Sequence, residues 1–214
     1  LERLVVDQLQ FENRQALLSV EDLMQMDVKR DYLIPDILPH PSVVLIYGAG
    51  GDGKSMSACA IAKHIATGKP FTVRDRLVPV QQGPVLLLNG DQPLVQLKEQ
   101  LEDVDFPITA NTKIQIDWQL QWYAQFKMLM DRHKPKLVVI DSLIGCSGGR
   151  AFDENKSEFA QPLYWLTRNN GVLFPKTTIL IIHHANKNGG FRGTSAIRDA
   201  VDETWSLAKP SEEE

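Results

Sequence analysis

The sequence lacks several features that would place it in a specialised class of protein. It has only two cysteines in 214 residues, Cys59 and Cys146, and these do not make a disulfide framework. No apolar run reaches the roughly 20 residues that a membrane-spanning helix needs, and the charges within residues 1–10 do not fit a signal peptide. The net charge of −4 argues against a uniformly basic nucleic-acid-binding protein, although a local basic patch remains compatible with it. These absences predict a cytoplasmic globular protein with reduced thiols and no membrane partner.

The length and composition are those of one sizeable α/β domain. Hydrophobic residues make up 43% of the chain and charged residues 23%, close to the average for soluble domains. We expect an N-terminal arm or docking segment at residues 1–32, the main domain at 33–208 and an acidic tail at 209–214. Because the chain starts at Leu1 rather than Met, we also expect a processed chain or a piece of a longer protein with other domains.

Apolar runs alternate with stretches of helical spacing along the chain. Continuous runs rich in β-branched residues predict buried parallel strands. We expect strands at 43–47, 85–88, 137–140 and 177–182, and shorter extended segments at 113–116 and 203–207. We expect helices at 54–67, 94–104, 118–133 and 157–170. This alternation predicts an α/β fold with three α-β-α layers around a mostly parallel sheet.

The segment between the first predicted strand and the first predicted helix has the spacing of a P-loop. It reads GAGGDGKS and satisfies the pattern GxxxxGK[ST]. Glycines allow backbone N–H groups to turn inward around an anion, and the following helix directs its positive end at phosphates. Lys54 is then expected to reach the β- and γ-phosphates of ATP, and the Ser55 hydroxyl to coordinate Mg²⁺. The predicted nucleotide-binding residues are Gly48, Ala49, Gly50, Gly51, Asp52, Gly53, Lys54, Ser55 and Met56.

Two aspartates at the ends of predicted strands are candidates for metal binding and catalysis. Asp141 ends the apolar run 137–140 in the manner of a Walker-B carboxylate, which holds Mg²⁺; the alternative is a helix-cap or turn residue. Ser142 follows it, so a general base for the attacking water must come from elsewhere. We predict Asp91, after the run 85–88, for that role, although Asn-Gly-Asp is also a common turn sequence.

The fourth predicted strand ends in His183 and His184. Adjacent strand residues point to opposite faces, so at most one of them faces the nucleotide, and we predict that His184 contacts the γ-phosphate. The glycine-rich stretch that follows carries Arg192 and Arg198, both suited to phosphate contact. We expect this stretch to be a flexible loop that binds DNA or a neighbouring subunit, the alternative being an ordinary solvent loop.

Together these blocks resemble the RecA-like ATPase core, in the RepA-type branch of hexameric replicative helicases. The resemblance covers residues 33–207, and its more specific parts are ATGKPF at 66–71, HHANK at 183–187 and RGTSAIRDAV at 192–201. It implies that Asp91 takes the place of the family's catalytic Glu, which is one methylene longer. It also implies that His184 is the γ-phosphate sensor, and that residues 152–155 are an acidic loop after Walker B.

The resemblance further implies an arginine finger that enters the neighbouring subunit's site. This chain has Asp202 at that position, so Arg192 or Arg198 takes over the role, the finger lies beyond Glu214, or hydrolysis is weak. The implied function is an ATP-driven motor on single-stranded DNA, assembled as a homo-oligomeric ring, in plasmid, phage or mobile-element replication.

Two other functions fit the P-loop. One is a KaiC-like regulatory or scaffold ATPase, which the net charge of −4 slightly favours over a DNA motor. The other is a metabolic kinase, which is disfavoured because the sequence has no lid-like arginine cluster and no acceptor-site signature.

Overall fold

The computed structural model describes residues 18–27, 29–90, 92–108, 111–148, 153–186 and 189–209. The chain divides into two compact units, Leu1–Arg30 and Asp31–Glu214. In the first unit, helix α2 (Val20–Gln25) starts with a capping box, in which Ser19 and Asp22 each accept a hydrogen bond from the other's backbone N–H. No residue of α2 is buried.

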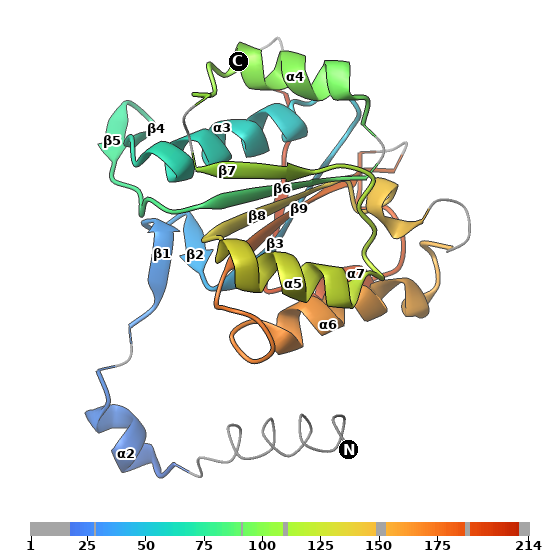
Figure 1. Ribbon diagram of the computed structural model, residues 1–214. Coiled ribbons are helices and arrows are strands. Elements are labelled where there is room, and N and C mark those ends of the chain that lie inside the picture. The colour runs from blue at the N-terminus through green and yellow to red at the C-terminus, as the bar shows by residue number, and fades with distance from the viewer. Residues whose placement is uncertain are drawn as a thin grey trace. The chain divides into compact units, whose positions relative to one another are not determined.

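The second unit is built on a six-stranded parallel sheet in the order β10-β3-β9-β8-β6-β7 (Figure 1). The strands are β3 (Ser42–Gly48), β6 (Val85–Asn89), β7 (Thr112–Gln115), β8 (Leu137–Asp141), β9 (Thr178–His184) and β10 (Glu203–Ser206). The four central strands are buried almost throughout, as expected of parallel strands that are covered on both faces.

Helices cover both faces of this sheet (Figure 1). Helices α3 (Lys54–Thr67) and α4 (Leu94–Asp103) lie on one face, and α5 (Tyr123–His133) and α6 (Gln161–Asn169) lie on the other. The predicted three-layer α-β-α architecture, with a mostly parallel RecA-like P-loop sheet, is confirmed.

The alternation of side chains along the strands produces two hydrophobic cores. Val43 and Leu45 of β3 belong to the core under α5 and α6, whereas Val44 and Ile46 belong to the core under α3. The sheet is therefore held from both sides, and its strand ends form a rigid edge on which a site can be built.

Short elements that the sequence analysis did not predict surround this framework. Two antiparallel pairs consist of β1 (Asp31–Ile34) with β2 (Leu38–His40) and β4 (Phe71–Val73) with β5 (Arg76–Val78). A single 3₁₀ turn occupies Gly145–Ser147. Another, Ser157–Ala160, takes up the first turn of the helix predicted at 157–170, of which Gln161–Asn169 is α-helical. The stretch expected to be a flexible loop contains the short helix α7 (Ala196–Asp199), whose Ile197 is fully buried.

The helix predicted at 118–133 begins only at Tyr123, so that prediction was wrong for residues 118–122. Trp118 donates its backbone N–H to Asn89 of β6 (3.0 Å), and Leu120 donates its own to Cys146 (2.7 Å). These long-range bonds replace the helical ones, while Trp118 and Leu120 remain buried. Their burial produced the apolar spacing that resembled the start of a helix.

Phe126 of α5 is central to the aromatic packing of one core. Its ring lies 5.1 Å from that of Phe174, 5.8 Å from that of Trp118 and 6.1 Å from that of Trp165, and the residue is 1% exposed. We expect Phe126→Ala to lower the free energy of unfolding by about 3–5 kcal/mol because it leaves a cavity. Met128→Ala, on the exposed side of the same helix, is the control and should change it by less than about 1 kcal/mol. Chemical denaturation of the two variants measures both values, and equal effects would contradict this account of the core.

Candidate nucleotide-binding site

Several of the predicted site residues lie at the carboxyl ends of neighbouring parallel strands. The last residue of β3, Gly48, pairs with His184, the last residue of β9. In the same way Asn89 at the end of β6 pairs with Asp141 at the end of β8. Open parallel sheets bind ligands at this edge. The fold therefore brings the P-loop, the predicted Walker-B aspartate and the second histidine to one edge of the sheet.

The first residue of the P-loop must be glycine because another backbone passes next to it. Leu207, directly after β10, donates its N–H to Tyr47 (2.8 Å), and a Cβ on Gly48 would lie 2.2 Å from the Leu207 carbonyl oxygen. Further along the loop, Gly51 and Gly53 have φ of +83° and +85°, a backbone conformation that residues with a side chain rarely adopt. The loop thus needs glycine for two physical reasons, close approach and left-handed backbone.

The start of α3 offers backbone donors to an anion. Gly53 is the N-cap residue, no side-chain hydrogen bond caps this end, and the first turn contains no acidic residue. The first N–H groups of a helix have no partner within the helix, and the helix dipole makes this end positive. Ser55 occupies the second helical position and is half-buried. This geometry fits the binding of phosphate groups.

Lys54 is a buried cation inside the loop. It is 5% exposed, and its Nζ donates hydrogen bonds to the carbonyl oxygens of Gly48 (2.9 Å) and Ala49 (2.6 Å). Burial lowers the pKa of Lys54, while the negative charges of Asp52 and Asp141 raise it. Because Asp141 acts on the lysine across space, the P-loop cation and the strand-end carboxylate share one electrostatic environment. Asp52 also braces the loop by accepting a hydrogen bond from the Ala49 N–H (2.8 Å).

Asp91, predicted as the general base, lies outside the described residues. The residues beside it are held firmly. The Asn89 side chain donates to the Gln92 carbonyl oxygen (3.0 Å) and accepts from the Gln92 N–H (2.9 Å). Gly90 donates its N–H to the Asp141 carbonyl oxygen (3.0 Å). The flanks of Asp91 are thereby tied to the end of β8, and its catalytic role stays a prediction.

The two histidines at the end of β9 differ in their surroundings. His183 is fully buried, its Nε2 lies 2.8 Å from the Arg192 carbonyl oxygen, and burial lowers its pKa. His184 is half-buried and lies beside Gly48, and the next residue, Ala185, donates its N–H to the Gly48 carbonyl oxygen (2.8 Å). Of the two, His184 is thus the one at the start of the P-loop.

The two arginines expected to contact phosphate have partners of other kinds within the described part of the chain. Arg192 donates from Nε to the carboxylate of Glu154. The Arg198 guanidinium carbon lies 5.1 Å from the centre of the Phe191 ring, a cation–π contact. Glu154 is a residue without a predicted role, and the acidic stretch at 152–155 is the sequence signal that points to it.

The residues of this site fit a magnesium ion that is bound together with a nucleotide. The described residues contain no group of three or more His, Cys, Asp or Glu side chains that could hold a metal. Mg²⁺ is typically bound by one or two protein groups together with substrate phosphates. Ser55 and Asp141 supply a hydroxyl and a carboxylate of that kind.

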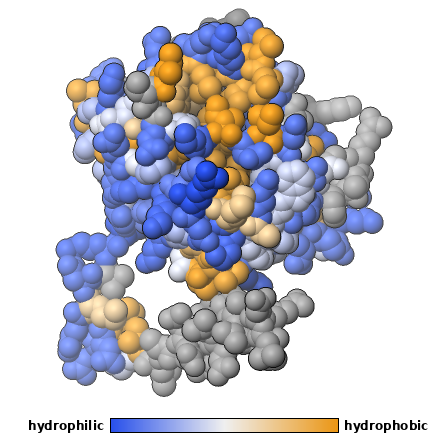
Figure 2. Space-filling view, in the orientation of Figure 1, coloured by the Kyte–Doolittle hydropathy of each residue, from blue (hydrophilic) through white to orange (hydrophobic). Residues whose placement is uncertain are grey.

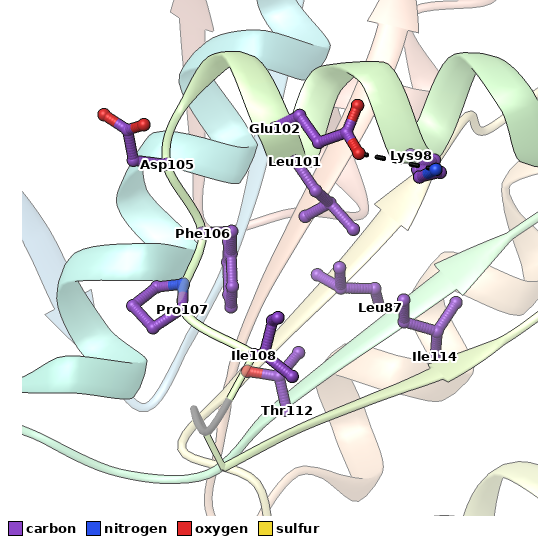
Figure 3. Close-up of a pocket in the computed structure, with 10 residues that line it drawn as sticks. All are labelled: Leu87, Lys98, Leu101, Glu102, Asp105, Phe106, Pro107, Ile108, Thr112 and Ile114. Atoms are coloured by element: carbon purple, nitrogen blue, oxygen red, sulfur yellow. Dashed lines mark ion pairs between the residues drawn. The ribbon is translucent and has the colours of Figure 1, made fainter.

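A separate apolar groove of about 560 Å³ lies between α4 and the β6–β7 side of the sheet (Figure 3). Leu101, Phe106, Ile108 and Ile114 contribute to its lining, and an ion pair between Lys98 and Glu102 lies at its side. Figure 2 shows hydrophobic surface over this part of the molecule. None of the residues that line the groove belongs to the P-loop or to the carboxyl end of a strand, so the groove is distinct from the nucleotide site.

The family model of the AAA domain matches residues 7–190, which is most of the chain. The chain therefore belongs to this AAA domain family, and both the family and the fold support a nucleotide-binding P-loop ATPase. No curated protein matches the sequence. No helix among the described residues is long and apolar enough to cross a membrane.

The close approach at Gly48 predicts a position-specific effect of one added methyl group. Gly48→Ala should lower the free energy of unfolding by about 1–3 kcal/mol, because β10 would have to shift away from β3. Gly50→Ala is the matched control, because a Cβ there meets nothing within 4 Å. It should change stability by less than about 0.5 kcal/mol in thermal or chemical denaturation without nucleotide. Equal stability of the two variants would contradict the close approach.

Proposed function

We propose that this chain binds ATP with Mg²⁺ and hydrolyses it as the motor of a RepA-type DNA helicase in plasmid, phage or mobile-element replication. One observation carries the ATP part of the proposal. The uncapped start of α3, the buried Lys54 and the strand-end Asp141 meet at one edge of the sheet, and Asp141 acts electrostatically on the lysine.

In this proposal each residue of the site has its own role in binding or hydrolysing ATP. Backbone N–H groups of the P-loop and Lys54 hold the β- and γ-phosphates, and these fixed donors offset the negative charge that the phosphate oxygens carry. Ser55 and Asp141 would hold Mg²⁺, which would neutralise part of the phosphate charge. Asp91 accepts a proton from the attacking water, and His184 contacts the γ-phosphate from the end of β9.

The proposal includes a homo-oligomeric ring, in which a neighbouring subunit completes the site. Asp202, which stands where the resemblance puts the finger, has a structural role: its carboxylate accepts a hydrogen bond from the Val43 N–H (2.7 Å), beside β10. In this proposal Arg192 or Arg198 supplies the arginine finger. Arg192 is paired with Glu154 in its own chain, so Arg198 is the better candidate.

The alternative is a KaiC-like regulatory or scaffold ATPase without unwinding activity. The net charge of −4 favours it, since a motor on single-stranded DNA needs a basic surface along the strand. The two functions differ in whether DNA changes the rate of ATP hydrolysis.

Two substitutions test the roles in nucleotide binding and hydrolysis separately. Lys54→Ala should weaken ATP binding by about ten- to hundredfold in calorimetry, because it removes a charge-assisted phosphate contact. Asp91→Asn should leave binding intact and slow hydrolysis by about a hundredfold or more, as the loss of a general base does. Lys69→Ala, an exposed lysine just after α3, is the control and should change neither. Unchanged ATP affinity in Lys54→Ala would refute the site, and unchanged turnover in Asp91→Asn would place the base elsewhere.

The motor proposal predicts that single-stranded DNA stimulates hydrolysis and that specific activity rises with protein concentration. An arginine supplied by a neighbour contributes about a thousandfold or more to turnover. Adding Arg198→Ala subunits to wild-type protein should therefore depress the wild-type rate by more than dilution does. Linear mixing and a flat specific activity would remove the ring from the proposal. Hydrolysis that is indifferent to DNA would favour the regulatory ATPase.

A further inference from the structure

Residues 185–186 and 189–191, after β9, pair with each other in an antiparallel arrangement, and we call them the base of the hairpin. Ala185 and Phe191 form an antiparallel bridge, and the Asn186 N–H donates to the Gly190 carbonyl oxygen (2.7 Å). The Asn186 side chain adds two bonds, accepting from the Gly190 N–H (3.0 Å) and donating to the Phe191 carbonyl oxygen (3.1 Å). The described residues at the base of this hairpin therefore have a defined conformation.

The base of the hairpin rests on the strands that carry the nucleotide site. The Phe191 ring lies 5.2 Å from the Tyr47 ring, next to the P-loop, and 5.3 Å from the His183 ring. The Arg192 carbonyl oxygen is bonded to His183 Nε2. The position of residues 191 and 192 thus sets the surroundings of His183, the neighbour of His184 on β9.

Glu154 holds the returning chain by two hydrogen bonds. Its carboxylate accepts from Arg192 Nε, and its carbonyl oxygen accepts from the Thr194 N–H (2.9 Å). Between these two bonds, Gly193 passes so close that a Cβ there would lie 2.8 Å from the Glu154 carbonyl oxygen, and its φ is +88°. We call this set of contacts, made by Glu154 with residues 192–194, the Glu154 seat.

The carboxylate of the seat is less exposed than the carboxylates of the ion pairs on α4 and α5. The Glu154 side chain is 14% exposed, compared with 64% for Glu102 and 49% for Asp131 in their pairs with lysines. Exposed pairs contribute little because water and salt screen them, whereas a carboxylate shielded from water interacts more strongly with its partner. The Arg192 side chain is 46% exposed, so the pair is shielded from water on its carboxylate side.

We propose that Glu154 is a positioning residue for ATP hydrolysis: the Glu154 seat holds the chain after β9 so that His183 and His184 keep their places at the P-loop edge. Glu154 follows β8, which ends in Asp141, and β8 neighbours β9 in the sheet. The seat thereby connects the segment that follows β8, which carries Asp141, to the segment that follows β9, which carries both histidines. This inference rests on the proposed ATPase function and adds a residue to it that does not touch the nucleotide.

The test is Glu154→Gln, which keeps the shape of the side chain and removes its charge. The turnover number for ATP should fall on the order of tenfold, because a small misplacement of a reacting or sensing group is costly, while ATP affinity stays within about twofold. Glu102→Gln, which breaks the exposed pair on α4, is the matched control and should change neither value. The double charge reversal Glu154→Arg with Arg192→Glu should recover part of the turnover lost in Glu154→Arg alone.

Amide hydrogen exchange supplies a readout that does not need hydrolysis. In Glu154→Gln the amides of residues 189–194 should exchange faster than in the wild type, while those of α5 stay unchanged. Unchanged turnover in Glu154→Gln would overturn the inference, and so would a parallel loss of ATP affinity and global stability, which indicates a merely structural role. If the wild type fails to hydrolyse ATP, the proposed function fails, and unchanged exchange at residues 189–194 would then overturn the seat as well.

Discussion

The parallel pairing of β3 with a strand on each side is the constraint on which the nucleotide site depends. β9 places His184 opposite Gly48, and β10 brings the Leu207 backbone so close that only glycine fits at the start of the loop. Because β3 cannot shift between these neighbours, the P-loop leaves the sheet from a fixed point. The start of α3, and with it Lys54, is thereby connected to a fixed strand end.

Charge and burial act together at this fixed point. Lys54 is removed from water, which lowers its pKa, but the carboxylates of Asp52 and Asp141 and two backbone carbonyl oxygens support its charge. A cation held in this way interacts strongly with phosphate because few water molecules screen it. The uncapped helix end adds donors that need no side-chain movement. A preorganised anion site follows from these features, and it agrees with membership of the AAA domain family.

The elements best predicted from the sequence are those whose signals are local. The bounds of α3 were predicted in full because glycines with left-handed backbone, Gly53 and Gly68, stand at its two ends. The buried strands were predicted within about two residues, since their β-branched runs are continuous. The predicted start of α5 was wrong because the Trp118 backbone donates a hydrogen bond to β6, and no local sequence pattern indicates such a contact. The two antiparallel pairs were missed because their strands have only three or four residues.

The sequence by itself determined the class of the fold, the P-loop and the candidate status of Asp141, because glycine spacing, strand composition and chain order are properties of short segments. Only the tertiary structure decided which histidine lies beside Gly48. It also decided that the Asp202 carboxylate accepts a hydrogen bond from Val43 of β3 and that Arg192 is paired with Glu154. The last two contacts join residues 159 and 38 positions apart. Contacts between residues so far apart in the sequence depend on the order of the strands in the sheet and on the path of the loops at its edge. The periodicity of the sequence determines neither of these.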